Sequence, residues 1–271
     1  MQMAHALTLT LLGWVALAST ARPAATGFLA RTLVLGSREV HYQVYVPAAY
    51  TPARSWPLVL FLHGSGERGA DNLAQLREGL APAIRAHSHW FPLLAVFPQA
   101  PADARWRDAT EQDVMRIVDA VAAEWQTDRD RTYVVGMSMG GYGAWQLAMD
   151  HPDRFAAVVP VCGGVLPPPR EPELLGVKVP HPSADPYAQI AQAVAGLPVW
   201  IFHGAEDPVV PVAESRRMVK ELVARGGAPR YTEYPFVGHD SWDPAFNSPD
   251  LWEWLLRQRR AAANTDAPRR E

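Results

Sequence analysis

The sequence predicts an α/β protein with a mainly parallel central sheet that is covered by helices on both faces. Three observations favour this class. Short apolar runs, typical of buried strands, alternate with segments of helical periodicity along the chain. A glycine-rich turn at 136–141 joins one such run directly to a helical segment. Near the N-terminus, residues 29–35 and 40–46 flank a Gly36-Ser37 turn, which predicts an antiparallel hairpin at the edge of the sheet.

Length and composition set the limits of this prediction. A chain of 271 residues, 48% of them hydrophobic, can bury a sizeable core, and no internal repeat marks a second unit, so we expect a single domain over 28–260. The formal net charge is −3 and no run of Lys or Arg exceeds two residues, which argues against a nucleic-acid partner. The single cysteine, Cys162, excludes an internal disulfide and a multi-thiolate metal site, and we expect it to be a small buried residue.

The N-terminal residues differ from the rest. An apolar run over 6–18 ends in Ala16-Leu17-Ala18, the pattern of a secretory signal peptide cleaved after Ala18, and it is too short for a comfortable membrane span. An uncleaved hydrophobic tail is the alternative. We therefore expect an exported protein, periplasmic or secreted, with a signal peptide at 1–18, a linker at 19–27 and a disordered tail at 261–271.

The remaining elements follow from periodicity and from turn signals. Strands are expected at 58–62, 93–97, 132–135, 155–161, 199–202 and 231–234, and helices at 72–85, 111–124, 142–149, 212–225 and 249–258. Between Cys162 and Ala195 lie seven prolines, which exclude a long helix before Ala188. This stretch follows a strand, so it lies near the carboxyl edge of the sheet, where ligands bind. It is either a partial lid or an irregular surface connection.

The turn at 136–141 carries the sequence Gly-Met-Ser-Met-Gly-Gly between a strand and a helix. The pattern G-x-S-x-G in this setting is typical of the nucleophile elbow of α/β-hydrolases, in which a sharp turn exposes the serine hydroxyl. Small residues on either side allow the backbone to pack closely. Ser138 is therefore the candidate nucleophile, and an ordinary glycine-rich connection is the alternative.

A neutral serine hydroxyl needs a base, and the base needs a carboxylate to hold its tautomer. On this fold the order along the chain is serine, acid, histidine. Of nine histidines only His239 follows the strand-ending loop at 203–211, and that loop carries Asp207. We therefore expect Asp207 as the orienting acid and His239 as the base. Glu206 is the competing acid, a turn carboxylate is a further alternative for Asp207, and a surface-loop histidine is the alternative for His239.

An oxyanion formed on the substrate needs preorganised N–H donors. On this fold one donor is the amide that follows the nucleophile, here Met139, and the other comes from the loop after the third strand. That loop is His63-Gly64-Ser65-Gly66, so Ser65 is the second candidate. A tight glycine turn that does not touch the substrate is the alternative.

Other residues that could take part in catalysis or metal binding are assigned structural or surface roles. His63 and His203 each precede a glycine at a strand end and are expected to be structural loop residues. His87 and His89 have a spacing that suits a metal, but no further ligands accompany them, so we expect a solvated pair and no metal or cofactor. Candidates for an aromatic wall around the substrate are Trp90, Trp106, Trp242 and Phe246.

With these residues in place, the chain resembles the α/β-hydrolase superfamily over 31–258. It is most similar to the bacterial carboxylesterase group related to polyhydroxybutyrate depolymerases, feruloyl esterases and dienelactone hydrolases. The segment 63–69 (HGSGERG) with Asp71-Asn72 resembles the oxyanion loop of that group. Gly238-His239, the following 241–243 and the terminal 252–256 (WEWLL) resemble its histidine loop and last helix. Members are often labelled predicted peptidases.

The motifs and the resemblance together predict a serine hydrolase that needs no cofactor and cleaves carboxylic esters through an acyl-enzyme. Its substrate would be a small-molecule or polysaccharide-linked ester. A serine peptidase of the same fold is the enzymatic alternative. A non-catalytic binding protein on a hydrolase scaffold is the alternative of another class, and the complete set of Ser138, Asp207 and His239 argues against it.

Overall fold

The computed structural model describes residues 25–169, 172 and 176–260. The signal peptide expected at 1–18, most of the linker at 19–27 and the tail at 261–271 lie outside this range. Within it, no helix has the length and apolar character needed to cross a membrane.

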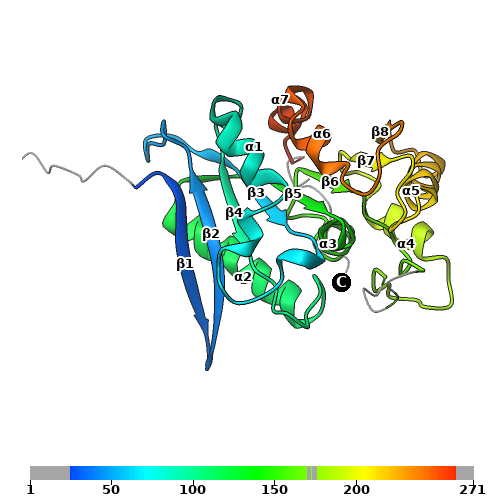
Figure 1. Ribbon diagram of the computed structural model, residues 1–271, viewed down its shortest axis with the longest axis horizontal. Helices are drawn as coiled ribbons and strands as arrows, with labels where there is room; N and C mark the ends of the chain where they lie inside the picture. Colours follow the sequence, from blue (N-terminus) through cyan, green and yellow to red (C-terminus); the bar gives the residue numbers. More distant parts are fainter. Residues whose placement is uncertain (1–24, 170–171, 173–175, 261–271) are drawn as a thin grey trace, which may run out of the picture.

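A twisted eight-stranded sheet forms the centre of the described chain (Figure 1). Its strands, in chain order, are β1 (Gly27–Leu35), β2 (Arg38–Val46), β3 (Trp56–Leu62), β4 (Leu94–Pro98), β5 (Thr127–Met137), β6 (Ala157–Val161), β7 (Trp200–Gly204) and β8 (Arg230–Tyr234). They lie side by side in the order β1-β2-β4-β3-β5-β6-β7-β8. The strand β2 runs antiparallel to β1 and β4, and the other neighbouring strands run parallel. The predicted edge hairpin and mainly parallel sheet are therefore confirmed.

Helices cover both faces of this sheet (Figure 1). They are α1 (Leu80–Ala86), α2 (Ala109–Glu124), α3 (Met139–Asp150), α4 (Pro186–Ala193), α5 (Ala213–Ala224), α6 (Trp242–Phe246) and α7 (Pro249–Arg257), with short 3-10 turns η1 (Ser65–Glu67), η2 (Ala74–Leu76) and η3 (Ser88–Trp90). Buried side chains of α2, α3, α4 and α5 belong to one apolar cluster, and those of α1, α6 and α7 belong to a second. The sheet separates the two clusters.

The strand β3 shows why continuous apolar runs predicted this architecture. Leu58, Leu60 and Leu62 pack into the cluster on one face, whereas Val59 and Phe61 pack into the cluster on the other. Because successive side chains of a strand point to opposite faces, a strand covered on both sides needs apolar residues at every position. All seven residues of β3 are buried.

The prediction of a helix at 72–85 is wrong. Only η2 and, from Leu80 onward, α1 are helical there, and Leu73 is 60% exposed. Gly79 interrupts the segment with φ of 75°. A Cβ at Gly79 would lie 2.7 Å from both the Met137 sulfur and the Phe61 ring, so the chain needs a glycine at this break.

Two further helices, α4 and α6, differ from the elements expected from the sequence. The helix α4 begins at Pro186, two residues before the expected limit, because proline is tolerated at the first position of a helix, where its missing N–H is not needed. The Asp185 carboxylate caps this helix by accepting from the Tyr187 amide at 3.0 Å. The short helix α6, which was not expected, begins at Trp242 at the end of the loop that carries His239. The prolines of this stretch that the structure describes before Pro186 lie outside its α-helices and strands.

Candidate active site

Ser138 occupies a sharp turn between β5 and α3. Its backbone has φ of 53° and ψ of −119°, a strained conformation for a residue with a side chain. The glycines around it allow a close approach of the backbone: a Cβ at Gly140 would lie 1.9 Å from the Leu62 carbonyl oxygen, and one at Gly136 would lie 2.0 Å from the Gly140 carbonyl oxygen. The predicted strand, turn and helix are present, and α3 begins at Met139, directly after the serine.

The structure brings Ser138, His239 and Asp207 together in a hydrogen-bonded row. The His239 Nε2 atom lies 2.8 Å from the Ser138 Oγ, and the His239 Nδ1 atom lies 2.7 Å from the Asp207 Oδ2. The three residues follow the carboxyl ends of β5, β8 and β7. Because parallel strands end at the same edge of a sheet, residues that are 101 positions apart in sequence meet there.

The Asp207 carboxylate is fully buried and accepts hydrogen bonds at both oxygens. The amides of Val209 and Val210 donate to Oδ1 at 2.8 and 2.9 Å, and His239 contacts Oδ2. Burial raises the pKa of Asp207, but the hydrogen bonds from the two neighbouring histidines and the backbone outweigh it and hold the pKa well below the usual range of a carboxyl group. The carboxylate therefore stays ionised at neutral pH.

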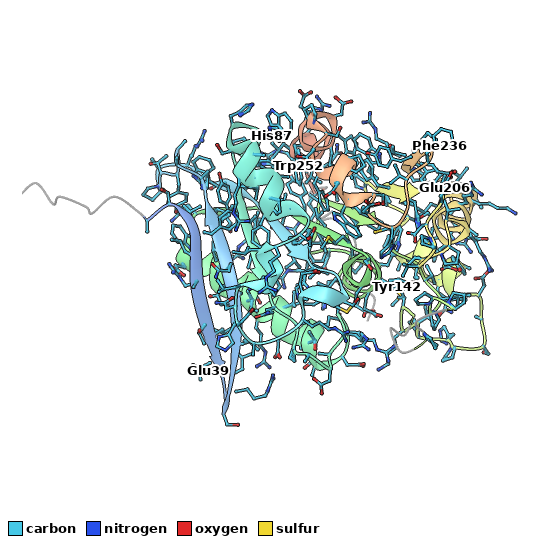
Figure 2. The ribbon with its side chains drawn as sticks, in the orientation of Figure 1. Glu39, His87, Tyr142, Glu206, Phe236 and Trp252 are labelled. Carbon is cyan, nitrogen blue, oxygen red and sulfur yellow. The ribbon has the colours of Figure 1, made fainter. Side chains whose placement is uncertain are left out.

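Glu206, the competing acid, lies outside this arrangement. It is solvent-exposed, and Figure 2 shows it on the outer side of the molecule. Its backbone amide donates to the Val237 carbonyl oxygen at 3.0 Å. The loop between β7 and α5 thus directs Asp207, and not its neighbour, toward His239.

His203 contacts Asp207, and the sequence analysis did not predict this contact. It is buried in β7, and its Nε2 lies 2.9 Å from the Val210 carbonyl oxygen and 3.3 Å from the Asp207 carboxylate. Both of these groups accept, so Nε2 carries the proton, and the Ser215 hydroxyl at 2.7 Å donates to Nδ1. His203 is therefore structural, as expected, but it also supports the acid. Its spacing of four residues from Asp207 was visible, although spacing alone does not reveal this contact.

A cleft of about 250 Å³ opens beside Ser138. Its walls are formed by Gly64, Ser65, Gly66, Glu67, Met137, Ser138, Val209, His239 and Trp242. Ser65 thus lies in the cleft wall next to the serine, and Met139 follows Ser138 at the start of α3. Both expected oxyanion donors therefore belong to segments that border the same side chain.

Buried polar contacts hold the turn that carries Ser65. The His63 Nδ1 atom donates to the Gly64 carbonyl oxygen at 2.6 Å, and its Nε2 accepts from the Ala100 amide at 3.0 Å. The Trp106 indole donates to the His63 carbonyl oxygen at 2.9 Å. Burial lowers the pKa of His63 to about 4, and its hydrogen bond with Gly64 offsets this only in part. The imidazole is neutral in the folded protein at neutral pH.

Folding stability should consequently fall as the pH drops from about 6.5 to about 4. The pKa of His63 in the folded protein lies below the ordinary 6.5, so the unfolded chain binds more protons in this window. The loss contributed by this residue amounts to about 3 kcal/mol. Urea unfolding at several pH values should show a shallower pH dependence for His63→Gln than for the wild type. His181→Gln, which changes an exposed histidine, should retain the wild-type dependence, and a retained slope in His63→Gln would refute this account.

Of the four aromatic candidates, one lines the cleft. Trp242 stands edge-on to His239, with ring centroids 5.4 Å apart. Trp106 and Phe246 are buried in the core, and Trp90 stacks on His87 with ring centroids 4.0 Å apart. The pair His87 and His89 thus flanks an indole on the surface of η3.

Cys162 is buried, as expected, directly after β6. Its sulfur, an Asp207 oxygen and a His239 nitrogen lie within 4.8 Å of one another, which is the spacing of a three-ligand metal site. Burial raises the pKa of this thiol, so it stays protonated, and the other two groups already bind each other. These residues therefore do not suit a metal ion.

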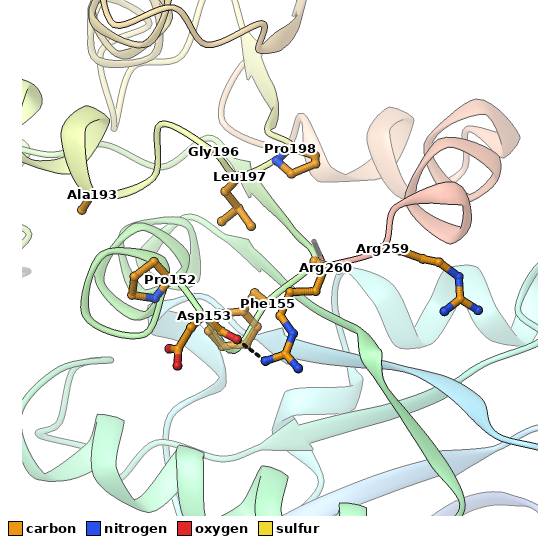
Figure 3. A pocket seen from close by; sticks show the side chains of 10 residues that line it. Pro152, Asp153, Phe155, Ala193, Gly196, Leu197, Pro198, Arg259 and Arg260 are labelled. Carbon is orange, nitrogen blue, oxygen red and sulfur yellow. Dashed lines mark hydrogen bonds between the residues drawn. The ribbon is translucent and has the colours of Figure 1, made fainter. Parts of the chain in front are cut away.

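A second and larger hollow, of about 480 Å³, lies at the opposite edge of the sheet (Figure 3). Asp153 and Pro198 line it at the amino ends of β6 and β7, together with Arg259 and Arg260. Each arginine is committed: Arg259 pairs with Asp128 at 3.2 Å, and Arg260 pairs with Asp130 and donates to the Asp153 carbonyl oxygen. The reactive groups lie at the smaller cleft, which is therefore the candidate active site.

A mainly parallel sheet with a serine at a strand-to-helix elbow, an acid after β7 and a histidine after β8 defines the α/β-hydrolase fold. Residues 35–253 match the protein family described as "Putative esterase", and the chain belongs to that family. The expected resemblance to esterases and polyester depolymerases is confirmed.

Individual relatives agree with this family. Putative esterase NocK of Nocardia uniformis subsp. tsuyamanensis is 29% identical over 213 residues, which cover 73% of this chain and 60% of NocK. Poly(3-hydroxyoctanoate) depolymerase of Pseudomonas fluorescens is 28% identical over 237 residues, or 76% of each chain. A crystal structure of a thermostable esterase is 34% identical with a TM-score of 0.73, covering 86% of this chain and 63% of the other. The chain thus spans less than two thirds of NocK and of the thermostable esterase.

Proposed function

We propose that the protein is a serine esterase that cleaves carboxylic esters through an acyl-enzyme intermediate. One observation carries this proposal: the Ser138 hydroxyl lies 2.8 Å from a histidine nitrogen whose partner nitrogen lies 2.7 Å from a buried, ionised carboxylate. A base within hydrogen-bond reach of a hydroxyl is what nucleophilic attack by serine requires. The membership of an esterase family supports the ester as the bond that is cleaved.

In the first half-reaction the His239 Nε2 accepts the proton of Ser138 as Oγ attacks the ester carbonyl carbon. The backbone amides of Ser65 and Met139 would donate to the oxyanion that forms. When the tetrahedral intermediate collapses, the protonated histidine gives its proton to the departing alcohol, which leaves an acyl group on Ser138. In the second half-reaction His239 deprotonates a water molecule that attacks the acyl carbon. It then returns the proton to the departing Ser138 Oγ as the carboxylic acid is released. Throughout, Asp207 fixes the tautomer of His239 and stabilises its cationic form.

The cleft indicates the part of the substrate that is recognised. At about 250 Å³ it is smaller than the cavities that usually enclose a whole drug-sized ligand. It therefore suits a small group next to the scissile bond, with the remainder of a small-molecule or polysaccharide-linked ester outside. We further propose that the enzyme acts after export, because the run at 6–18 ends in the Ala-x-Ala pattern of a signal peptidase site.

A fluorophosphonate probe tests the nucleophile and the reaction class together. We expect a single adduct in the intact mass, located by peptide mapping on Ser138, and turnover of 4-nitrophenyl acetate and butyrate that the probe abolishes. An adduct on Ser65, the other serine in the cleft, would refute the assignment. Faster cleavage of peptide amides than of esters would instead indicate a peptidase, and binding of esters without turnover would indicate a non-catalytic scaffold.

A further inference from the structure

The cleft contains a second ionisable side chain besides His239. Glu67, the last residue of η1, lines the same wall as Ser65 and Gly66. Neither the row of Ser138, His239 and Asp207 nor the backbone donors of the oxyanion involve its carboxyl group. A carboxylate beside a serine nucleophile contributes charge at the place where the substrate binds.

The position of Glu67 relative to the nucleophile follows from the space around Gly64. A Cβ at Gly64 would lie 3.0 Å from the Glu67 Oε2 atom and 3.6 Å from the Ser138 Cβ. The carboxylate oxygen and the nucleophile therefore border the same face of Gly64. A side chain at this position would crowd the Glu67 carboxylate, which would have to move by a few tenths of an ångström.

A hydrogen bond from Gln99 fixes the backbone of Glu67. The Gln99 amide group donates to the Glu67 carbonyl oxygen at 3.2 Å and to the Asp71 carboxylate at 2.8 Å. Asp71 in turn accepts from the amides of Leu73 and Ala74, both at 2.9 Å. These contacts connect η1 to the end of β4 and hold the backbone of Glu67 in place beside the cleft.

No arginine or lysine in the described part of the chain forms an ion pair with Glu67. Arg68 donates to the Ser65 carbonyl oxygen at 2.9 Å, and Arg77 lies 3.6 Å from Asp71. Burial, and to a smaller extent the nearby Glu78, raise the pKa of Glu67. The backbone amides of Gly64 and Glu67 and the charge of Arg77 lower it. The net shift of the pKa is upward. At pH values above this raised pKa, Glu67 adds a negative charge to the cleft, and no ion pair with an arginine or lysine of the described chain neutralises it.

We propose that Glu67 is a specificity residue that makes the cleft favour esters with a cationic group near the scissile bond and disfavour esters with an anionic group there. This inference rests on the proposed esterase function. A unit charge in the substrate that lies several ångströms from the Glu67 carboxylate, in a site still open to water, would change the second-order rate constant by about tenfold.

The test compares substrates that differ only in charge. Butyrylcholine and its carbon isostere 3,3-dimethylbutyl butyrate place the difference on the alcohol side, and 3-sulfopropyl butyrate supplies an anion there. The methyl esters of glycine betaine and of 3,3-dimethylbutyrate place the difference on the acyl side. kcat/KM is measured at pH 8 for the wild type, Glu67→Gln and Glu78→Gln. Glu78 is the matched control, because it is an exposed carboxylate near Glu67 that does not line the cleft.

In Glu67→Gln we expect kcat/KM for a cationic ester, relative to that of its neutral isostere, to fall about tenfold in at least one pair. The ratio of kcat/KM for the sulfonate ester to that of the neutral ester should rise. Both expectations hold whatever the variant does to the neutral esters. Glu78→Gln should keep the wild-type ratios within about twofold. In the wild type, 0.5 M NaCl should weaken the preference for the cation, a measurement that does not depend on how the variant folds. Charge ratios that are equal in all three proteins and insensitive to salt would overturn the role of Glu67. Failure of the wild type to hydrolyse even the neutral esters would overturn the esterase function itself.

Discussion

Ser138→Ala is expected to lower kcat for ester hydrolysis about a million-fold. The alanine removes the atom that attacks the carbonyl, and His239 then has no hydroxyl within its 2.8 Å reach. The residues of a serine triad act as a unit. Loss of the nucleophile alone therefore removes almost the whole rate enhancement that the three residues provide. Steady-state hydrolysis of 4-nitrophenyl butyrate by purified protein measures this effect.

Two observations make the result specific to the nucleophile. Ser65→Ala removes the other hydroxyl of the cleft but keeps its backbone amide, and it should cost less than about tenfold in kcat if the amide, and not the hydroxyl, is the donor. The circular dichroism and thermal unfolding of Ser138→Ala should match those of the wild type. More than a few per cent residual activity in a clean preparation would exclude Ser138 as the nucleophile.

Asp207→Asn should reduce kcat by about ten-thousand-fold while the protein remains folded. The carboxylate presents oxygens to four donors: two backbone amides, His239 and His203. An amide side chain has a single oxygen, so its NH₂ group must face some of these donors. If it faces His239, the imidazole adopts the tautomer that cannot accept the serine proton through Nε2.

Glu206→Gln is the matched control for this prediction, because it makes the same chemical change one residue earlier. The exposed Glu206 side chain does not contact His239, so we expect kcat to remain within about twofold of the wild type. Both variants are measured side by side, with circular dichroism as a check on folding. Greater damage from Glu206→Gln would mean that the loop between β7 and α5 orients the other acid.

The sequence allowed the fold to be predicted where the chemistry of a segment is local. The run at 58–62 is apolar at every position because β3 is covered on both faces, and that property is visible without a structure. The elbow around Ser138 was equally readable, because the G-x-S-x-G pattern between a strand and a helix marks it. The order of Ser138, Asp207 and His239 along parallel strands then limited the choice of partners.

Features that depend on distant contacts were not predictable in this way. The segment at 72–85 has helical periodicity, but Gly79 breaks it to avoid Phe61 and Met137, which come from other strands. The contact between His203 and Asp207 depends on the loop that folds back after β7. Which aromatic residues line the cleft was likewise set by packing. The motif at 63–69 contains Glu67 but does not reveal that this residue lines the cleft, and Val209 belongs to no motif.

The distance of 101 residues between Ser138 and His239 also affects how the enzyme acquires activity during synthesis. A ribosome delivers the chain from its N-terminus, so the elbow is complete long before the histidine that activates it has been made. Contacts between residues so far apart close large loops and tend to form late in folding. On the proposed mechanism, Ser138 therefore has no base to activate it until the residues after β8 have been made and that strand has joined the sheet.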